Sequence, residues 1–213
     1  MTLGNGIDVV LFDVGGVVLR LADITTLGSF NGLTDSHSIK DLWSRCAIVR
    51  EHETGRLTAE AFATRMVEAY TIDATPEEFL MRFCAWPGAI FDGIEGLLAD
   101  LDPRLEVACL SNTCDIHWRT MVAAADMTRL FKRQFLSFRL GLMKPDAEIY
   151  LQTVRELACA PNRILFFDDS QANVDGARAI GIDAHRVEGP ERCRAILDRY
   201  GLLRAGSTRI GST

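Results

Sequence analysis

The residues of this chain that could do chemistry are three aspartates, a serine and a lysine, and each follows an apolar run of strand length. They are Asp13 after residues 7–12, Ser111 after 105–110, Lys144 after 135–138, and Asp168 with Asp169 after 164–167. Because ligands of open α/β sheets bind beyond the carboxyl ends of the strands, these positions predict one shared site. Carboxylates packed together repel unless a cation or a proton joins them. The pattern therefore favours a functional cluster over unrelated turn residues.

The chemistry that suits this set is phosphoryl transfer. Carboxylate oxygens are the ligands that Mg²⁺ prefers, and this ion binds through a few carboxylates together with substrate phosphate. The metal and Lys144 would neutralise the charges of the nucleophile and the phosphate, which otherwise repel each other. Ser111 and the amides that follow it would hold the phosphoryl oxygens. Asp13 is then the candidate nucleophile, forming an aspartyl phosphate that water hydrolyses.

The apolar runs themselves predict the elements that position these residues. Four of them are continuous rather than alternating, which is typical of strands buried on both faces of a parallel sheet. A weaker fifth strand is expected at residues 184–187. Helical patterns lie between the runs, for example in residues 149–157, and Pro145 suits a first helical turn. The alternation predicts a doubly wound, Rossmann-like α/β sheet.

One interval breaks this alternation. No good strand is apparent between Val18 and Leu105, whereas helix starts precede residues 39–51, 59–70 and 79–83. The last start, Thr75-Pro76-Glu77-Glu78, has the pattern of a capping box with proline at the first helical position. We therefore expect residues 20–92 to form an all-helical cap over Asp13. The predicted core then comprises residues 1–19 and 93–204, and residues 205–213 are predicted to be a flexible tail.

Composition excludes some kinds of partner. The 213 residues carry a net charge of −6, and no local cluster of Lys and Arg offsets it, which argues against nucleic acid or a membrane as the main partner. The N-terminal residues lack a secretory signal pattern, and no apolar run is long enough to cross a bilayer. The expected location is the cytoplasm, and the expected partner is a small molecule.

Two sets of residues are predicted to be structural. The cysteines are scattered, with the closest pair spaced C-x4-C, and are expected to be reduced core residues. The aromatic residues of the predicted cap follow helical spacing and are expected to pack its core. These aromatic residues are Trp43, Phe62, Tyr70, Phe79, Phe83 and Trp86.

Taken together, four motifs in order resemble the haloacid dehalogenase (HAD) superfamily. They are Leu11-Phe12-Asp13-Val14-Gly15-Gly16-Val17, Leu110-Ser111-Asn112-Thr113, Lys144-Pro145-Asp146, and Phe166-Phe167-Asp168-Asp169-Ser170 with Asn173. The insertion between the first two motifs is at the position of the helical, C1-type cap of subfamily I. His52-Glu53-Thr54-Gly55-Arg56-Leu57 and Tyr70 further resemble the subgroup of glucose-1-phosphate phosphatases and the N-terminal domain of soluble epoxide hydrolase.

The resemblance implies a role for each motif residue. Asp13 would be both nucleophile and metal ligand, with the carbonyl of Gly15 and the pair Asp168 and Asp169 completing the Mg²⁺ site. The other motif residues would contact the phosphate, and two of them, Ser111 and Lys144, would also act in catalysis. The implied phosphate contacts are Gly16, Ser111, Asn112 and Lys144.

Gly15 departs from the family pattern. The family's phosphatases usually carry a second aspartate there, which protonates the leaving group and then activates water, and glycine cannot transfer a proton. Three interpretations remain: a silent phospholigand-binding or regulatory protein, a substitute acid, or a substrate whose leaving oxygen hardly needs protonation. The last favours sugar 1-phosphates or acyl phosphates, and we prefer it. The candidate substitute acids are His52, Glu53, Asp115 and His117.

Overall fold

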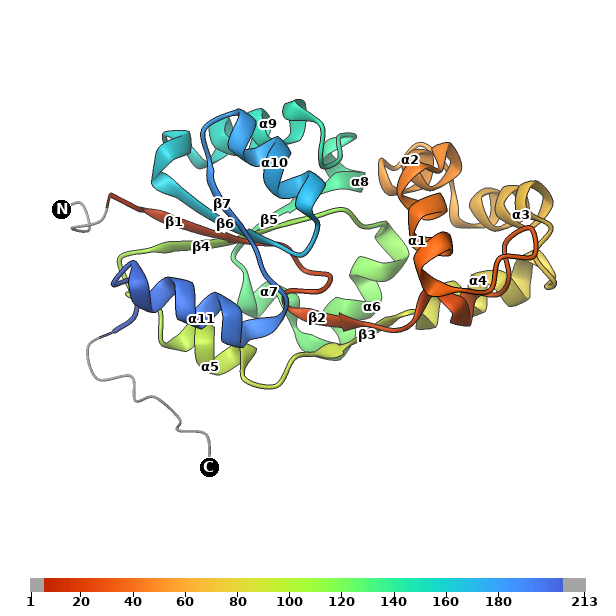
Figure 1. The fold of residues 1–213 in the computed structure, drawn as a ribbon, viewed down its shortest axis with the longest axis horizontal. Helices are drawn as coiled ribbons and strands as arrows, with labels where there is room; N and C mark the ends of the chain where they lie inside the picture. The colour runs from red at the N-terminus through yellow and green to blue at the C-terminus, as the bar shows by residue number, and fades with distance from the viewer. Residues whose placement is uncertain (1–5, 205–213) are drawn as a thin grey trace.

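A five-stranded parallel sheet is the centre of the computed structural model, which describes residues 6–204 (Figure 1). Its strand order is β5-β4-β1-β6-β7. The strands are β1 (Val9–Phe12), β4 (Glu106–Ser111), β5 (Arg133–Leu136), β6 (Ile164–Asp168) and β7 (Asp183–Arg186). Every residue of β1 and β6 is buried, as expected for continuous apolar strands in the middle of a parallel sheet. The predicted sheet is confirmed.

The register of this sheet brings the candidate residues to one edge. Phe12 at the end of β1 pairs with Cys109 on β4 and with Phe167 on β6. The next residue, Asp13, donates its backbone amide to the carbonyl of Phe167 at 2.8 Å. The carboxyl ends of β1, β4 and β6 therefore coincide, and Asp13 lies between the ends of its two neighbours.

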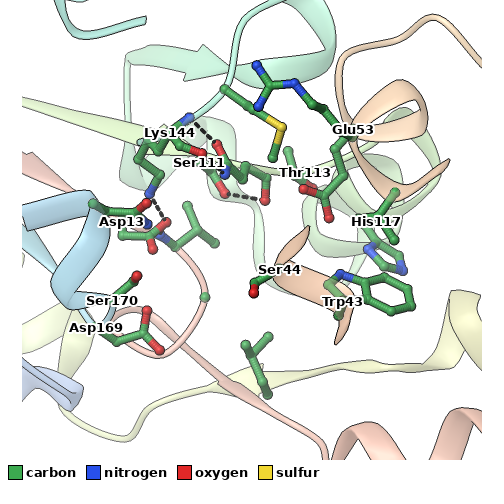
Figure 2. Close-up of a pocket in the computed structure, with 18 of the residues that line it drawn as sticks. Asp13, Trp43, Ser44, Glu53, Ser111, Thr113, His117, Lys144, Asp169 and Ser170 are labelled. Atoms are coloured by element: carbon green, nitrogen blue, oxygen red, sulfur yellow. Dashed lines mark hydrogen bonds and ion pairs between the residues drawn. The ribbon is translucent and has the colours of Figure 1, made fainter. Parts of the chain in front are cut away.

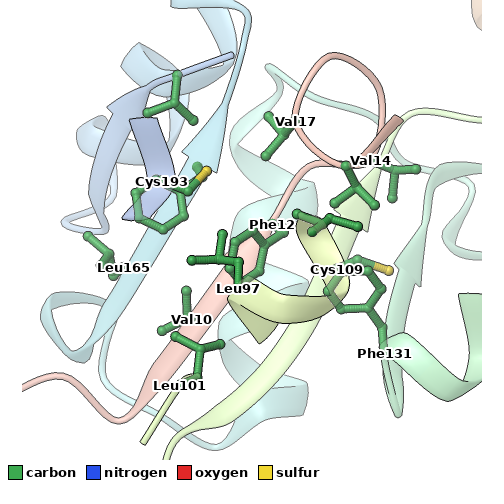
Figure 3. Close-up of a cluster of buried hydrophobic side chains, with 14 of the residues drawn as sticks. Val10, Phe12, Val14, Val17, Leu97, Leu101, Cys109, Phe131, Leu165 and Cys193 are labelled. Atoms are coloured by element: carbon green, nitrogen blue, oxygen red, sulfur yellow. The ribbon is translucent and has the colours of Figure 1, made fainter. Parts of the chain in front are cut away.

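Helices cover both faces of the sheet (Figure 1). On one face, α5, α6, α7 and α11 enclose a core that includes Val10, Phe12, Leu97 and Phe131 (Figure 3). On the other face, α9 and α10 pack on Leu11 and the remaining inward side chains. The bounds are α5 (Ile94–Ala99), α6 (Asp115–Ala125), α7 (Met127–Leu130), α8 (Ser137–Leu140), α9 (Ala147–Leu157), α10 (Gln171–Ala179), α11 (Gly189–Arg199) and the 3₁₀ turn η2 (Pro161–Arg163).

The helices between β2 and β3 have a hydrophobic core of their own, centred on Phe30, Phe62, Phe79 and Phe83. The predicted capping box is present, since Thr75 accepts from the Glu78 amide while the Glu78 carboxylate accepts from the Thr75 amide. The elements are η1 (Ile24–Leu27), α1 (Ser36–Arg45), α2 (Ala47–Glu53), α3 (Ala59–Tyr70) and α4 (Pro76–Ala85). The exact limits of a cap domain, 20–92, stay a prediction.

The structure corrects the expectation that no strand lies between Val18 and Leu105. β2 (Leu19–Leu21) and β3 (Pro87–Ile90) form an antiparallel ribbon that joins the α1–α4 helices to the sheet (Figure 1). These strands are short, and β3 begins Pro-Gly, a pair typical of turns. Gly88 is needed for a close approach, because a Cβ there would lie 2.2 Å from the carbonyl oxygen of Arg20.

Two further boundaries differ from the prediction. The expected helix 39–51 is broken at Cys46, which is buried and extended, within contact of Met66 Sδ and the Tyr70 hydroxyl. The expected strand 135–138 ends at Leu136, because α8 begins at Ser137.

All six cysteines are free, so the prediction of unpaired thiols is confirmed, although Cys84 and Cys159 are only half-buried. Within residues 6–204, no helix is long and apolar enough to span a membrane. The predicted flexible tail, 205–213, lies outside the described residues.

Candidate active site

Asp13, Lys144 and Asp168 form a buried ionic cluster at the sheet edge (Figure 2). The Lys144 Nζ lies 2.9 Å from Asp13 Oδ1 and 2.6 Å from Asp168 Oδ2, and it also donates to the carbonyl oxygen of Leu110 at 3.0 Å. The Val14 amide donates to the same Asp13 Oδ1 at 2.6 Å. Both contacts to Asp13 fall on Oδ1, so Oδ2 is the oxygen left to meet a substrate or a metal.

Asn112 positions Lys144 rather than reaching out to a ligand. Its Nδ2 donates to the Lys144 carbonyl oxygen at 2.9 Å, and its Oδ1 accepts from the Lys144 amide at 2.9 Å. This reciprocal pair fixes the loop before α9 against the end of β4. The Asn112 side chain is thus engaged with the Lys144 backbone, while Asn112 and the neighbouring Ser111 both line the cavity. The phosphate contacts implied for these two residues stay predictions.

Asp168 and Asp169 are neighbours with different surroundings. The fully buried Asp168 accepts from Lys144, from the Ser170 amide at 2.9 Å, and from Asn173 Nδ2 at 3.0 and 3.2 Å. Both of its oxygens are thus engaged within the protein. Asp169 is more exposed and lines the cavity beside Asp13. Asp168 is placed to orient Lys144, whereas Asp169 is placed to bind a ligand in the cavity.

The charge of this cluster fits a divalent cation. One carboxylate oxygen of each of Asp13, Asp168 and Asp169 lies within 4.8 Å of the other two. Burial, together with the charge of Asp168, raises the pKa of Asp13 well above its usual value and also raises the pKa of Asp169. Three carboxylates against the single charge of Lys144 leave two negative charges when all are ionised. A divalent cation would balance them.

The turn after β1 needs glycine at position 16. Gly16 has φ +73°, and a Cβ there would lie 2.4 Å from Asp169 Oδ2. Its amide donates to the Leu19 carbonyl at 2.8 Å, so this amide is not available for the phosphate contact that the sequence implied. Gly15 is different, because its Cβ would meet only the side chain of Leu21, at 3.3 Å. Position 15 therefore has room for a side chain if Leu21 shifts slightly.

A cavity of about 700 Å³ joins this cluster to the helices α1 and α2. Figure 2 shows Glu53, Trp43 and His117 across the cavity from Asp13 and Lys144. Of the aromatic residues expected to pack a core, Phe62, Phe79 and Phe83 are buried there. Trp43, Tyr70 and Trp86 are partly buried and pack against the same hydrophobic core, as expected. Trp43 and Trp86 also reach the cavity wall, which helical spacing alone does not indicate.

Comparison with known proteins identifies the family of the chain. A family model described as haloacid dehalogenase-like hydrolase matches residues 7–181, which contain the whole cluster. The chain belongs to the haloacid dehalogenase-like hydrolase family. The resemblance drawn from the four motifs is confirmed, while the narrower subgroup stays a prediction. The chain is a hydrolase of the HAD superfamily with an α/β fold, in which helices flank a parallel sheet.

Several known proteins are similar to this chain. The D-ribitol-5-phosphate phosphatase of Bacteroides thetaiotaomicron is 25% identical over 84% of this chain and 91% of its own length. The phosphorylated carbohydrates phosphatase of Thermotoga maritima is 23% identical over 95% and 93%, respectively. A HAD family enzyme from B. thetaiotaomicron, solved with magnesium and inorganic phosphate, superposes with a TM-score of 0.70 at 24% identity, covering 85% of this chain and 94% of that one. The last likeness shows the fold.

The four candidate substitute acids of this HAD protein lie in different surroundings. Only Glu53 and His117 line the cavity. The His117 Nε2 is hydrogen-bonded to the Phe83 carbonyl at 2.7 Å, and burial lowers its pKa to about 4. His52 is buried, stacked on Phe62, and bonded through Nδ1 to Leu57. The exposed Asp115 is paired with Arg119.

Proposed function

We propose that this protein is a Mg²⁺-dependent phosphatase that hydrolyses a small phosphorylated metabolite through an aspartyl phosphate on Asp13. One observation carries the proposal. Asp13 and Asp169 line the same cavity as the buried Lys144, which is paired with Asp13. Membership of the HAD hydrolases and the phosphatase activity named for two relatives support it. A cytoplasmic location is retained as part of the proposal.

Asp13, Asp169 and the carbonyl of Gly15 are the proposed metal ligands. The excess negative charge of the cluster and the spacing of its carboxylates support a divalent cation, and a related HAD enzyme binds magnesium. Mg²⁺ would neutralise phosphate charge and orient the phosphoryl group. Because both oxygens of Asp168 are already hydrogen-bonded, we propose that Asp168 acts through Lys144 rather than as a direct ligand.

The protein's own groups would act in sequence. The charge of Lys144 favours the ionised form of Asp13 against the effects of burial and Asp168, and Lys144 and the Ser111 hydroxyl would bind phosphoryl oxygens. The end of β1 would aim Asp13 at phosphorus. Attack by an Asp13 oxygen breaks the ester bond, and the leaving oxygen takes its electron pair. Water then attacks the phosphorus of the aspartyl phosphate, releasing inorganic phosphate and the free Asp13 carboxylate.

The favoured substrate is a sugar phosphate with a good leaving group, such as a sugar 1-phosphate. The relatives named for ribitol phosphate and phosphorylated carbohydrates support the carbohydrate class. Trp43 and Trp86 line the cavity, and indole rings suit packing against the C–H face of a sugar ring. Ser44 and Arg50 add polar groups to the same cavity.

A panel of phosphometabolites, sugar 1-phosphates included, tests this function. Wild-type protein with Mg²⁺ is expected to release phosphate from at least one member, and Asp13→Asn is expected to release none. Saturable binding of phosphorylated ligands without any release would instead favour the second candidate, a silent phospholigand-binding or regulatory protein. The observation behind that candidate is Gly15, which stands where the family's acid usually lies.

A further inference from the structure

The leaving group needs a proton donor if it is an alcohol, and Gly15 cannot supply one. Of the four candidate acids, two are removed by position: His52 lies within the packing of α3, and Asp115 is on the surface. His117 reaches the cavity, but its Nε2 contacts Phe83 and its low pKa keeps the ring neutral near pH 7. Glu53 alone combines a carboxyl group with an open path into the cavity.

The end of α2 that carries Glu53 is held against the sheet domain. One turn earlier, Arg50 forms an ion pair with Asp146, just after Lys144 in the chain. Two residues later, Gly55 has φ +72°, and a Cβ there would lie 2.6 Å from the Phe138 carbonyl oxygen on α8. These contacts fix both flanks of Glu53. Its side chain points into the cavity, opposite Asp13 and Lys144 (Figure 2).

We propose that Glu53 is the general acid and base of the reaction, in place of the residue missing at Gly15. The inference rests on the proposed phosphatase function. It replaces the interpretation of an unassisted leaving group with that of a substitute acid, and so also admits sugar phosphates whose leaving group is an ordinary alcohol. Glu53 lies on the helical side of the cavity, so it approaches the leaving oxygen from the side opposite to the nucleophile Asp13. That geometry suits an in-line displacement, in which nucleophile and leaving group lie on opposite sides of phosphorus.

The electrostatics of Glu53 suit this role. Burial raises the pKa of Glu53 to about 7. A hydrogen bond from Trp43 and the charge of Lys144 act in the opposite direction and lower this pKa, but by less. A group with a pKa near the working pH is both a competent acid and a competent base. The other charged or titratable groups that face the cavity or Glu53 in the described residues are Asp13, Asp169, Arg45, Arg50, Cys46, Cys114, Lys144 and His117.

The proton balance closes over the two steps. When Asp13 attacks phosphorus, the bond between phosphorus and the leaving oxygen breaks, and that oxygen takes the proton from the Glu53 carboxyl. The Glu53 carboxylate then takes a proton from the attacking water as its oxygen bonds to phosphorus. The Asp13–phosphorus bond breaks, its electron pair returns to Asp13, and Glu53 is again protonated.

A pair of esters with different leaving groups tests the role. Benzyl phosphate releases an alcohol and needs the acid, whereas 4-nitrophenyl phosphate releases an acidic phenol and hardly needs it. In Glu53→Gln, the ratio of kcat/KM for benzyl to 4-nitrophenyl phosphate is expected to fall about a hundredfold, the usual size of an acid's contribution. The control is Glu51→Gln on the same helix, where Glu51 pairs with Arg65 away from the cavity.

Wild-type protein provides a second measurement that does not depend on the folding of a variant. Its kcat/KM for benzyl phosphate is expected to fall as pH rises above about 7, because the acid must be protonated for the first step. An unchanged ester ratio in Glu53→Gln, or wild-type turnover of the nitrophenyl ester alone, would overturn the role of Glu53 and leave the phosphatase proposal standing. Failure of wild-type protein on every phosphate ester would overturn the phosphatase proposal itself.

Discussion

Replacing Lys144 with methionine tests whether the ionic cluster is organised as described. The Lys144 Nζ is enclosed by Asp13 Oδ1, Asp168 Oδ2 and the Leu110 carbonyl, and its side chain is 1% exposed. Methionine keeps much of the volume and removes the charge. Two buried carboxylates then lose their shared counter-charge, while the polar contacts from Asn173 and Ser170 remain on Asp168.

The expected loss is large because a buried ion pair is broken on one side only. Removing one partner of such a pair costs about 3–5 kcal/mol in the free energy of unfolding. For a chain of this size that corresponds to a fall of about 6–20 °C in Tm, at about 2–4 °C per kcal/mol. The loss should depend on pH. Without Lys144, the pKa of Asp13 rises further in the folded state, and an acid whose pKa is raised on folding adds stability as pH falls.

Urea unfolding without divalent cations, at pH 8 and near pH 5, measures this effect. Lys144→Met is expected to be much less stable than wild type at pH 8 and closer to it near pH 5. The control is Lys132→Met, since Lys132 is exposed and outside the cluster. A loss below about 1 kcal/mol at pH 8, the size typical of surface ion pairs, or a loss independent of pH, would refute the reasoning.

Three further predictions concern the turn at Gly16, the hydrogen bonds of Asn112 to Lys144, and the metal. Gly16→Ala should lower stability by about 1–3 kcal/mol and weaken Mg²⁺ binding, because of its φ of +73° and the contact with Asp169. Gly93→Ala, with φ +85° and open space, isolates the backbone strain and should leave Mg²⁺ affinity unchanged in calorimetry. Asn112→Ala should cost about 1–3 kcal/mol in urea unfolding by leaving the Lys144 amide and carbonyl unpaired. Mg²⁺ at a hundred times its Kd should stabilise wild type by about 2.7 kcal/mol, and Asp169→Asn should lack this gain; an equal gain would contradict the assignment.

The sheet and its strand-end residues could be predicted because both depend on local patterns. A continuous apolar run predicts a buried parallel strand. Because parallel strands all end at the same edge of the sheet, Asp13 and Asp168 must lie at that edge together. The β2–β3 ribbon was missed because its strands are short and its pairing, Leu19 with Ile90, joins residues far apart in the chain. Nothing local distinguishes such a ribbon from a turn.

The roles of single side chains were harder to predict, because they depend on partners from other elements. Asn112 was implied to bind phosphate, yet its partner is Lys144, 32 residues later. Trp43 follows the spacing of a core residue and nevertheless reaches the cavity, because a large aromatic ring on a half-buried helix face can do both. Glu53 could be chosen among the four candidate substitute acids only once the structure showed which of them line the cavity.

The central claim is that Asp13 becomes phosphorylated during turnover. The most direct test is a rapid acid quench of wild-type protein with Mg²⁺ and its best substrate, followed by mass spectrometry of the peptide that contains Asp13. A phosphate adduct on Asp13 that forms and decays at the rate of turnover, and is absent from Asp13→Asn, is the expected result. Phosphate release at an undiminished rate by Asp13→Asn would contradict the claim.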